Sequence, residues 1–183
     1  MLSGPRKPQR VAVFISGGGS TLQALLEMHH QMHLKLIVTS SSKAYGSLKA
    51  RRFGKPVIQF GKPFNYQQLH QTLLDNKIEC IILAGFMKIL PTEFVEQWKN
   101  RIINIHPSLL PKYPGLKSAE RSWNDNSSMG VTLHRVIAEM DAGPKLFQKT
   151  ALLRPKGLTF EEAGLFLRRT EQHLLREMVL RYC

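Results

Sequence analysis

The chain has 183 residues, 43% of them hydrophobic, which is enough for one compact α/β domain with a core of its own. No apolar run is long enough to span a bilayer, and the polar start, Met1–Arg10, lacks the apolar region of a secretory signal. Cys80 and Cys183 supply neither a disulfide framework nor a metal-ligand spacing, so we expect a cytoplasmic, metal-free protein that contacts no membrane.

The net charge of +13 is the least ordinary feature of the composition. A basic chain is typical of nucleic-acid binding. The basic residues are, however, spread along the chain without a dense run. Anionic small substrates, such as phosphates and folate carboxylates, account for a basic surface equally well. We therefore expect small-molecule substrates rather than a nucleic-acid partner.

The first predicted motif is a strand, a glycine loop and a helix. Arg10–Ile15 is a β-rich run, Ser16–Ser20 contains three consecutive glycines, and Thr21–Glu27 is helical, with Ser20 and Gln23 at the spacing of a capping box. Exposed N–H groups at such a helix N-terminus bind anions. The P-loop lysine and the Gly-x-Gly-x-x-Gly spacing are absent, so neither a Walker site nor a dinucleotide site is indicated. Two interpretations stay open, a bound phosphate monoester and a tight turn without a ligand.

The alternation of strands and helices continues through the first half of the chain. Strands are predicted over residues 34–39, 56–59 and 79–84, and helices over residues 45–53 and 65–76, the second with Asn65 as its cap. This order predicts the α/β fold class: a single domain over residues 1–183, doubly wound, with a mostly parallel sheet and helices on both faces. Ligands of such sheets bind beyond the carboxyl ends of the strands.

The segment Gly85–Pro91 is apolar although it follows a strand and is expected to be a loop. One interpretation is that it forms the wall of a pocket for a flat aromatic ligand. The other is ordinary packing under the next helix, which is predicted over residues 92–98.

A polar pair, Asn104 and His106, stands where the following strand ends. The β-branched run that begins at Arg101 predicts a buried strand, whereas the prolines and glycine within residues 107–115 exclude both helix and central strand. Residues two apart on a strand point to the same side, so the two polar heads are expected to converge. An amide donor beside a group that titrates near neutrality suits acyl transfer, as oxyanion donor and proton carrier. A turn that satisfies two polar side chains locally is the alternative.

The rest of the chain is predicted to contain a helix over residues 118–123, a strand over 130–136, a turn over 138–144, a return strand from 146 and a final helix. Thr159 and Glu162 form a capping box at the start of that helix. Asp141 is held in the tight turn, where an aspartate usually bonds only nearby backbone. His134 alternates with apolar residues of its strand and, taken alone, is typical of a structural histidine.

Four stretches together resemble the phosphoribosylglycinamide formyltransferases, or glycinamide ribonucleotide transformylases, a branch of the formyl-folate transferase superfamily. They are residues 13–25, 83–90, 104–116 and 134–144. The loop Asn-x-His-Pro-Ser-Leu-Leu-Pro at residues 104–111 marks formyl-folate transferases in general, and its continuation Lys-Tyr-Pro-Gly-Leu narrows the resemblance to this branch. The resemblance implies an enzyme that transfers a formyl group from its co-substrate 10-formyltetrahydrofolate to the amine of glycinamide ribonucleotide in de novo purine synthesis.

The resemblance also implies the residues of the site. Asn104, His106 and Asp141 would be the catalytic set, with Asp141 favouring the imidazolium form of His106 and assisting proton transfer through a water. His134 would be structural, beside the site, and no metal would take part. The residues implied to bind the ribonucleotide are Gly17, Gly18, Gly19, Ser20, Thr21, Pro107 and Glu171. Those implied to bind the folate are Met87, Lys88, Ile89, Leu90, Ile137, Ala138, Glu139 and Met140.

Some positions depart from the family pattern. Gly18 and Thr21 stand where the family usually has asparagine, and Lys145 replaces a usually aliphatic residue. Gln172 precedes a histidine where the family often has a carboxylate, so we assign that substrate contact to Glu171.

Other functions remain open beside this one. A formyltransferase acting on a sugar-nucleotide amine would use the same catalytic set, although the loop after Asn104 argues against it. A non-catalytic folate- or nucleic-acid-binding module would not need Asn104, His106 and Asp141 together. A methionyl-tRNA formyltransferase or a deformylating hydrolase would require a further domain. Monomer and homodimer are both compatible with the sequence.

Overall fold

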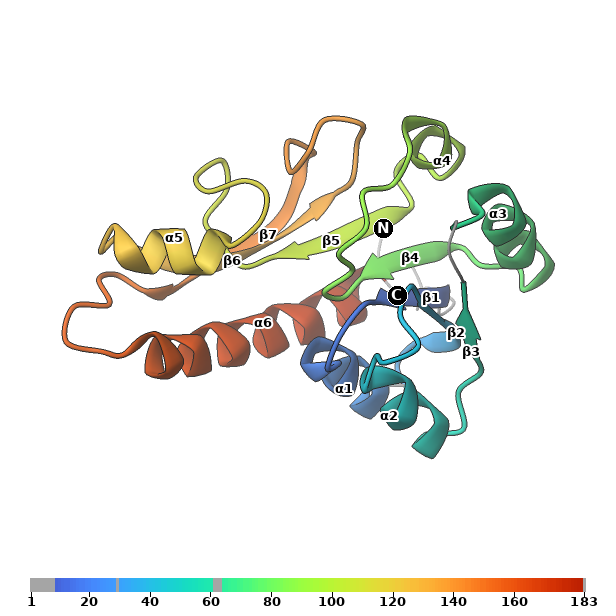
Figure 1. Ribbon diagram of the computed structural model, residues 1–183, viewed down its shortest axis with the longest axis horizontal. Coiled ribbons are helices and arrows are strands. Elements are labelled where there is room, and N and C mark those ends of the chain that lie inside the picture. The colour runs from blue at the N-terminus through green and yellow to red at the C-terminus, as the bar shows by residue number, and fades with distance from the viewer. Residues whose placement is uncertain (1–8, 29, 61–63, 183) are drawn as a thin grey trace, which may run out of the picture. The chain divides into compact units, whose positions relative to one another are not determined.

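The computed structural model describes residues 9–28, 30–60 and 64–182, and it divides into two compact units (Figure 1). The first unit contains residues 1–90 and 176–183, and the second contains residues 91–175. Residues 1–8, which include most of the stretch used to exclude a secretory signal, and Cys183 lie outside the described residues. Within the described residues, no helix combines the length and the hydropathy needed to cross a membrane. One domain over residues 1–183 stays a prediction.

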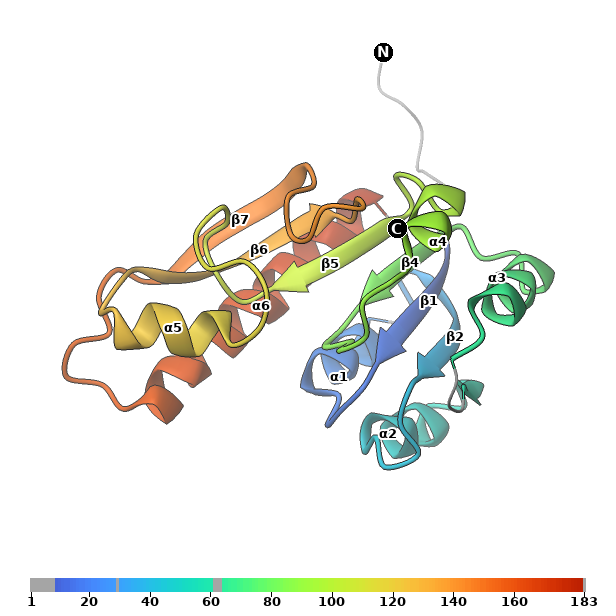
Figure 2. The same ribbon diagram turned by 45° about the horizontal axis from the view of Figure 1, so that its top comes forward.

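The first unit is a parallel β-sheet covered by helices. Its strands lie in the order β3-β2-β1-β4, and every pairing between them is parallel. Helices α1 and α2 lie on one face of these strands and α3 on the other, as Figures 1 and 2 show. In chain order the elements are β1 (Arg10–Ile15), α1 (Ser20–Glu27), β2 (His33–Thr39), α2 (Gly46–Arg52), β3 (Val57–Gln59), α3 (Tyr66–Asp75) and β4 (Cys80–Leu83).

The apolar runs of β1 and β4 form the core of this unit. Every side chain from Val11 to Ile15 is fully buried, and Cys80–Leu83 is buried throughout. Such continuous apolar runs are typical of parallel strands that helices cover on both faces. The Phe86 ring extends the core into the loop after β4, with its centroid 5.4 Å from that of Phe14 and 6.1 Å from that of Phe64.

The start of α1 differs from the predicted capping box of Ser20 and Gln23. Gly19 is the N-cap, with a φ of 69°, and no side chain caps the helix. Because glycine takes this left-handed conformation freely, the loop ends one residue earlier than expected and Ser20 already belongs to the helix. The side chain of Gln23 donates to Glu27 instead, at 3.0 Å.

Two other predicted helix caps are confirmed. The side chain of Asn65 accepts a hydrogen bond from Gln68 N at 2.9 Å and begins α3. Thr159 and Glu162 form a reciprocal capping box, because Glu162 N donates to Thr159 Oγ1 and Thr159 N donates to the Glu162 carboxylate.

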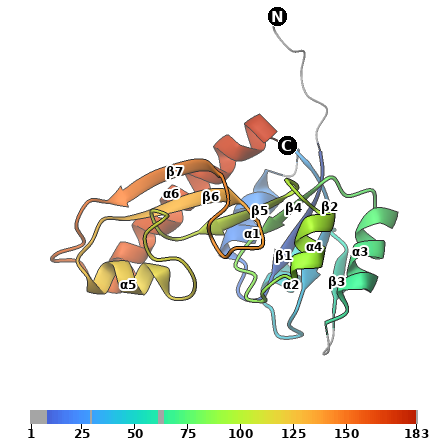
Figure 3. The same ribbon diagram turned by 90° about the horizontal axis from the view of Figure 1, so that it is seen from above.

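The second unit is built on an antiparallel sheet of β5, β6 and β7. A turn joins β6 to β7, so the two strands run in opposite directions (Figure 3). The strands of the first unit form the parallel sheet that the sequence predicts, and the predicted return strand is confirmed as β7. The elements are α4 (Thr92–Gln97), β5 (Ile102–His106), α5 (Ser118–Asn124), β6 (Met129–Arg135), β7 (Lys145–Leu152) and α6 (Phe160–Tyr182). Only residues 160–175 of α6 belong to this unit.

Candidate active site

The strand register of the second unit brings two of the polar residues together. Asn104 and His106 lie in β5, at its carboxyl end, as the sequence predicts. β6 pairs with β5 so that His134 stands directly opposite Asn104, although 30 residues separate them in the chain. The side chain of His134 is buried, and its Nε2 lies 3.2 Å from Asn104 Nδ2.

Asp141 reaches the same place because the turn after β6 folds back tightly. Arg135 N donates to Pro144 O at 2.9 Å, which closes the turn over the end of the strand. Gly143 permits this approach, since a Cβ at that position would lie 1.8 Å from Arg135 O. Asp141 itself has a φ of 54°, a left-handed conformation that aspartate tolerates better than most residues.

We expect Gly143→Ala to disturb this turn, because the added methyl group cannot fit against the Arg135 carbonyl. Overpacking of this kind costs about 1–3 kcal/mol of stability, and the displaced turn would carry the Asp141 carboxylate with it. Urea unfolding and a turnover assay together measure both effects. Gly18→Ala is the matched control for stability, since no atom lies within 4 Å of a Cβ added there. Equal stability of the two variants would contradict this account of Gly143.

Both oxygens of the Asp141 carboxylate are engaged by the surrounding groups. Oδ1 accepts a hydrogen bond from Asn104 Nδ2 at 3.3 Å and lies 3.4 Å from His134 Nε2. Oδ2 accepts from the backbone N–H of Gly115 at 2.7 Å and lies 3.4 Å from His106 Nδ1. The polar heads of Asn104 and His106 therefore converge, one on each oxygen of the same carboxylate. Their catalytic roles stay predictions.

The geometry around Asn104 leaves one amide hydrogen available. Asn104 Nδ2, Asp141 Oδ1 and His134 Nε2 form a nearly equilateral triangle with sides of 3.2, 3.3 and 3.4 Å. The two acceptors therefore subtend about 60° at the amide nitrogen, half the roughly 120° between its two hydrogens. One N–H can serve both acceptors, and the other is directed away from them. In its neutral form His134 takes the acceptor role, because its Nδ1 donates to Arg135 O at 2.9 Å.

His106 is buried, and both of its ring nitrogens face protein oxygens. Nε2 lies 2.9 Å from Tyr113 O, and because a carbonyl only accepts, Nε2 carries a hydrogen. Nδ1 is 3.4 Å from Asp141, longer than an ordinary N–H···O bond. Burial lowers the pKa of His106, and this outweighs the Tyr113 carbonyl and the Asp141 charge, which raise it. The predicted influence of Asp141 thus has the expected sign, but burial disfavours the imidazolium form in the free protein.

The Asp141 carboxyl is ionised. Burial would raise its pKa, but a hydrogen bond from His134, whose Nε2 donates only when the ring is doubly protonated, the N–H of Gly115 and the charges of protonated His106 and His134 lower the pKa from 3.8 to about 2. Hydrogen bonds to the charged form and adjacent positive charge both favour a carboxylate.

This shift predicts a loss of stability in acid. A carboxyl whose folded pKa lies below its unfolded value stabilises the fold above pH 4, and the contribution disappears as the pH falls through about 2. The quantity to compare is the free energy of unfolding of the unchanged protein minus that of Asp141→Asn. We expect this difference to be larger at pH 6 than at pH 2 by on the order of 1–2 kcal/mol. Urea unfolding of both proteins between pH 2 and pH 6 measures this difference. A difference independent of pH would contradict the assignment.

Buried hydroxyl groups hold the loop that follows β5. Thr132 Oγ1 donates to Ser108 O at 2.7 Å and accepts from Leu110 N at 3.2 Å. Ser108 Oγ donates to Lys112 O at 2.7 Å. Lys145, which replaces a usually aliphatic residue, donates from Nζ to Leu110 O at 3.0 Å. These bonds fix the chain just before Tyr113, whose carbonyl orients His106.

The glycine loop of the first unit presents unused backbone donors. Within the described part of the chain, the N–H groups of Gly17, Gly18 and Ser20 donate to no protein acceptor. The carbonyls of the loop face α2, because Gly46 N donates to Gly17 O and Lys49 Nζ donates to Gly19 O. Free N–H groups beside a helix N-terminus suit an anion, which favours the ligand-binding interpretation of this loop over an empty turn.

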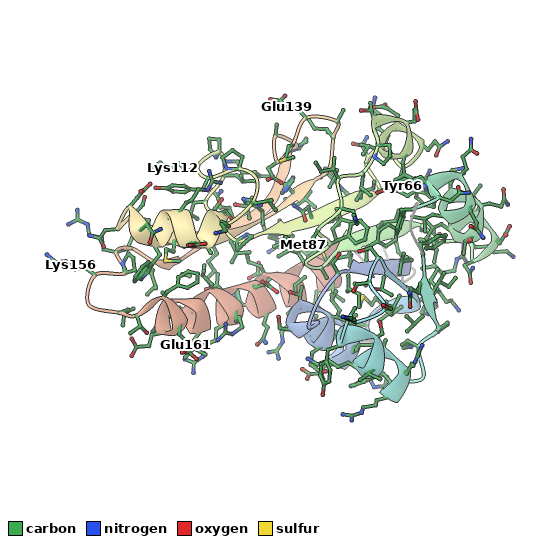
Figure 4. The ribbon with its side chains drawn as sticks, viewed as in Figure 1. Tyr66, Met87, Lys112, Glu139, Lys156 and Glu161 are labelled. Carbon is green, nitrogen blue, oxygen red and sulfur yellow. The ribbon has the colours of Figure 1, made fainter. Side chains whose placement is uncertain are left out.

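The segment after β4, also in the first unit, exposes its apolar side chains. Met87 and Ile89 are 65% and 77% exposed, so they are not packed under a helix as the alternative interpretation supposed. The backbone of the segment is nevertheless fixed, since Met87 N donates to Ser16 Oγ and Tyr66 Oη donates to Ile89 O. Figure 4 labels Met87 and Tyr66 among these side chains.

The other predicted binding residues belong to the second unit, except Thr21. Ile137, Ala138, Glu139 and Met140 are exposed in the turn between β6 and β7, where Figure 4 labels Glu139. Pro107, Glu171 and, in the first unit, Thr21 are half-buried. Two backbone groups of the site, the carbonyl of Tyr113 and the N–H of Gly115, cannot be predicted from the sequence, because a backbone contact depends on the path of the loop rather than on residue type.

Comparison with known proteins places the chain among enzymes that transfer formyl groups. A family model described as "Formyl transferase" matches residues 9–179. Phosphoribosylglycinamide formyltransferase of Escherichia coli strain K12 is 34% identical over 149 residues, which cover 75% of this chain and 70% of that protein. The trifunctional purine biosynthetic protein adenosine-3 of Drosophila pseudoobscura is 38% identical over 168 residues, which cover 85% of this chain but 12% of that protein.

Solved structures agree with the sequence matches. The crystal structure of phosphoribosylglycinamide formyltransferase from Anaplasma phagocytophilum is similar with a TM-score of 0.90 and 34% identity, over 95% of this chain and 86% of that chain. The likeness confirms the predicted α/β fold class, and the family match confirms the predicted resemblance. The chain spans only about an eighth of the trifunctional proteins that it matches. It belongs to the formyl transferase family.

Proposed function

We propose that the protein transfers a formyl group from 10-formyltetrahydrofolate to the amine of glycinamide ribonucleotide, a step of purine synthesis. The observation that carries this proposal is the convergence of Asn104, His106 and His134 on the carboxylate of Asp141. Relatives named phosphoribosylglycinamide formyltransferase, matched over most of their length, support the choice of substrates.

Asn104 is the oxyanion donor in this proposal. The amine attacks the formyl carbon, so a C–N bond to the amine forms while the C–N bond to the folate breaks. Negative charge develops on the formyl oxygen during the attack, and a preorganised N–H stabilises it. The amide hydrogen of Asn104 that serves neither His134 nor Asp141 supplies this bond, and those two acceptors hold the amide in place.

In this proposal His106 and Asp141 stabilise charge and assist proton transfer. One proton has to move from the attacking amine to the leaving folate nitrogen, and a water beside the Asp141 carboxylate relays it. His106 becomes imidazolium when Nδ1 takes up a proton, and the ionised Asp141 stabilises that form across 3.4 Å. Because its Nε2 is held by the Tyr113 carbonyl, His106 in this conformation acts through its charge rather than through a direct hydrogen bond.

Substrate contacts are assigned from the sequence resemblance together with local geometry. The unused N–H groups of Gly17–Ser20 support binding of the ribonucleotide phosphate, with Thr21, Pro107 and Glu171 as further contacts. Residues 87–90 and 137–140 are assigned to the folate, and the exposed apolar side chains among them, those of Met87, Ile89, Ile137 and Met140, support binding of its flat ring. Monomer and homodimer both stay predictions, as does a cytoplasmic location.

The choice of acceptor amine is tested by offering two of them. The protein is incubated with 10-formyltetrahydrofolate and either glycinamide ribonucleotide or a sugar-nucleotide amine, while folate absorbance and the formylated product are followed. We expect turnover with glycinamide ribonucleotide and none with the sugar-nucleotide amine. Turnover with the sugar nucleotide and none with glycinamide ribonucleotide would replace the substrate assignment and leave the chemistry of the site intact.

The basic charge is expected to serve small anions rather than nucleic acid. Binding to a mixed-sequence DNA duplex should be weak and lost at moderate salt, as contacts to phosphates alone are. Fluorescence anisotropy with a labelled duplex at two salt concentrations measures this. Tight, sequence-selective binding at about 0.15 M salt would instead support a nucleic-acid-binding module.

A further inference from the structure

A cavity lined by two basic residues lies in the first unit, between α2 and the strands β2 and β3. It has a volume of about 260 Å³. Its lining includes Ser42, Lys43, Tyr45, Ser47, Leu48 and Arg51. None of them belongs to the glycine loop or to the candidate active site.

The cavity carries positive charge without a compensating carboxylate. Its lining contains Lys43 and Arg51 but neither aspartate nor glutamate. The sequence has no acidic residue anywhere between Glu27 and Asp75. Within the described residues, neither Lys43 nor Arg51 forms an ion pair or a side-chain hydrogen bond. Two free cations at one concave surface attract an anionic group.

A buried hydroxyl group lining the cavity lacks a partner. Ser47 Oγ is inaccessible to solvent and makes no hydrogen bond to any described residue. Because this hydroxyl has no partner to lose, rotation of the Ser47 side chain can turn it toward a ligand in the cavity. The hydroxyl of Ser42 adds a further donor to the same lining.

Different sides of α2 face this cavity and the glycine loop. In α2, Arg51 stands three residues after Leu48 and four after Ser47, so these three side chains share one face of the helix, and all three line the cavity. Lys49 does not line the cavity: its Nζ donates to Gly19 O and lies 5.7 Å from the centroid of the Tyr45 ring. One side of α2 therefore supports the glycine loop while another forms the cavity.

The rest of the cavity lining can contact an apolar or aromatic part of a ligand. The side chains of Tyr45 and Leu48 line the cavity and are 53% and 49% exposed. A flat group stacked on Tyr45 would cover surface that is otherwise open to water. The cations and hydroxyls would face the charged end of the same ligand.

We propose that this cavity binds a small organic phosphate, a phosphate monoester whose body is the size of a nucleoside. Lys43 and Arg51 bind the phosphate oxygens, Ser47 Oγ turns toward the cavity and donates a hydrogen bond to the ligand, and Tyr45 covers its body. The site is separate from the phosphate position proposed at Gly17–Ser20, and it does not depend on the proposed formyl transfer.

The test is calorimetric titration of the full chain with adenosine monophosphate, ribose 5-phosphate and inorganic phosphate as probes. We expect adenosine monophosphate to bind with saturation and inorganic phosphate to bind at least about 10-fold more weakly, because it lacks the body. Arg51→Glu should weaken adenosine monophosphate binding about 10-fold or more, as loss of a charge-assisted hydrogen bond does.

Arg52→Glu is the matched control, because it makes the same change in net charge on the same helix outside the cavity lining. Its expected effect is less than about 3-fold, since exposed charges are largely screened. Ser47→Ala should weaken binding without lowering the melting temperature, because the hydroxyl has no protein partner to lose. Gly18→Asp should leave adenosine monophosphate binding unchanged. Four outcomes would each overturn the proposal. They are equal losses of affinity in Arg51→Glu and Arg52→Glu, equal affinity for all three probes, loss of binding in Gly18→Asp, and no saturable binding.

Discussion

Asp141→Asn is expected to lower turnover by at least about 10²–10³-fold, the scale on which removal of an oxyanion-stabilising group acts. The carboxylate offers an acceptor oxygen to Asn104 on one side and to the N–H of Gly115 on the other. An asparagine at position 141 has only one oxygen, so in either orientation its NH₂ group meets one of these two donors. The substitution also removes the negative charge that stabilises the imidazolium of His106.

The decisive control for Asp141→Asn is its combination with Asn104→Ala. If the two residues act as one unit, the double variant should be about as slow as the slower single variant, because such effects do not add. Circular dichroism and urea unfolding at pH 7 establish that each variant is folded before rates are compared. Near-normal turnover of a folded Asp141→Asn would remove the carboxylate from the proposed mechanism.

Gly18→Asp is expected to raise the KM for glycinamide ribonucleotide by about 10-fold or more, since a like charge would stand beside the phosphate. No atom lies within 4 Å of a Cβ built on Gly18, and its φ is not positive, so the side chain fits without disturbing the fold. The unused N–H groups that flank this position are the ones proposed to bind the phosphate. Initial rates over a range of ribonucleotide concentrations measure the change.

Gly18→Asn is the matched control, because it has the same shape without the charge and should raise the KM much less. Affinity for a folate analogue, measured by calorimetry, should change little in either variant. If Gly18→Asp abolished folate binding and left ribonucleotide binding intact, the two substrate assignments would be exchanged. If it disturbed neither, the glycine loop would be only a tight turn.

Much of the fold could be predicted because the apolar pattern of the strands is simple. Runs such as Val11–Ile15 and Cys80–Leu83 are apolar throughout, which is typical of central parallel strands. The cap of α1 could not be predicted in the same way, because Ser20 has the right spacing from Gln23 but Gly19 ends the loop first. The antiparallel register that sets His134 opposite Asn104 joins residues 30 apart, and no local period encodes it.

In the candidate site too, some features follow from local sequence and others depend on residues far apart in the chain. Convergence of Asn104 and His106 follows from the two-residue period of a strand, so the sequence alone predicts it. The contribution of Asp141 came only from family resemblance, because its position depends on the close approach of Gly143 to Arg135. The lowered pKa of His106 is a consequence of burial, and burial of a polar residue at a strand end depends on the whole unit.

The most direct test of formyl transfer follows the formyl carbon itself. The protein is mixed with 10-formyltetrahydrofolate labelled with ¹³C at the formyl group and with glycinamide ribonucleotide, and the products are separated and analysed by NMR spectroscopy and mass spectrometry. We predict that the label appears in the amide of formylglycinamide ribonucleotide, in equal amount to the tetrahydrofolate released, and that Asp141→Asn suppresses both. Label found in free formate, or retained on the folate while the protein is folded, would contradict transfer to this amine.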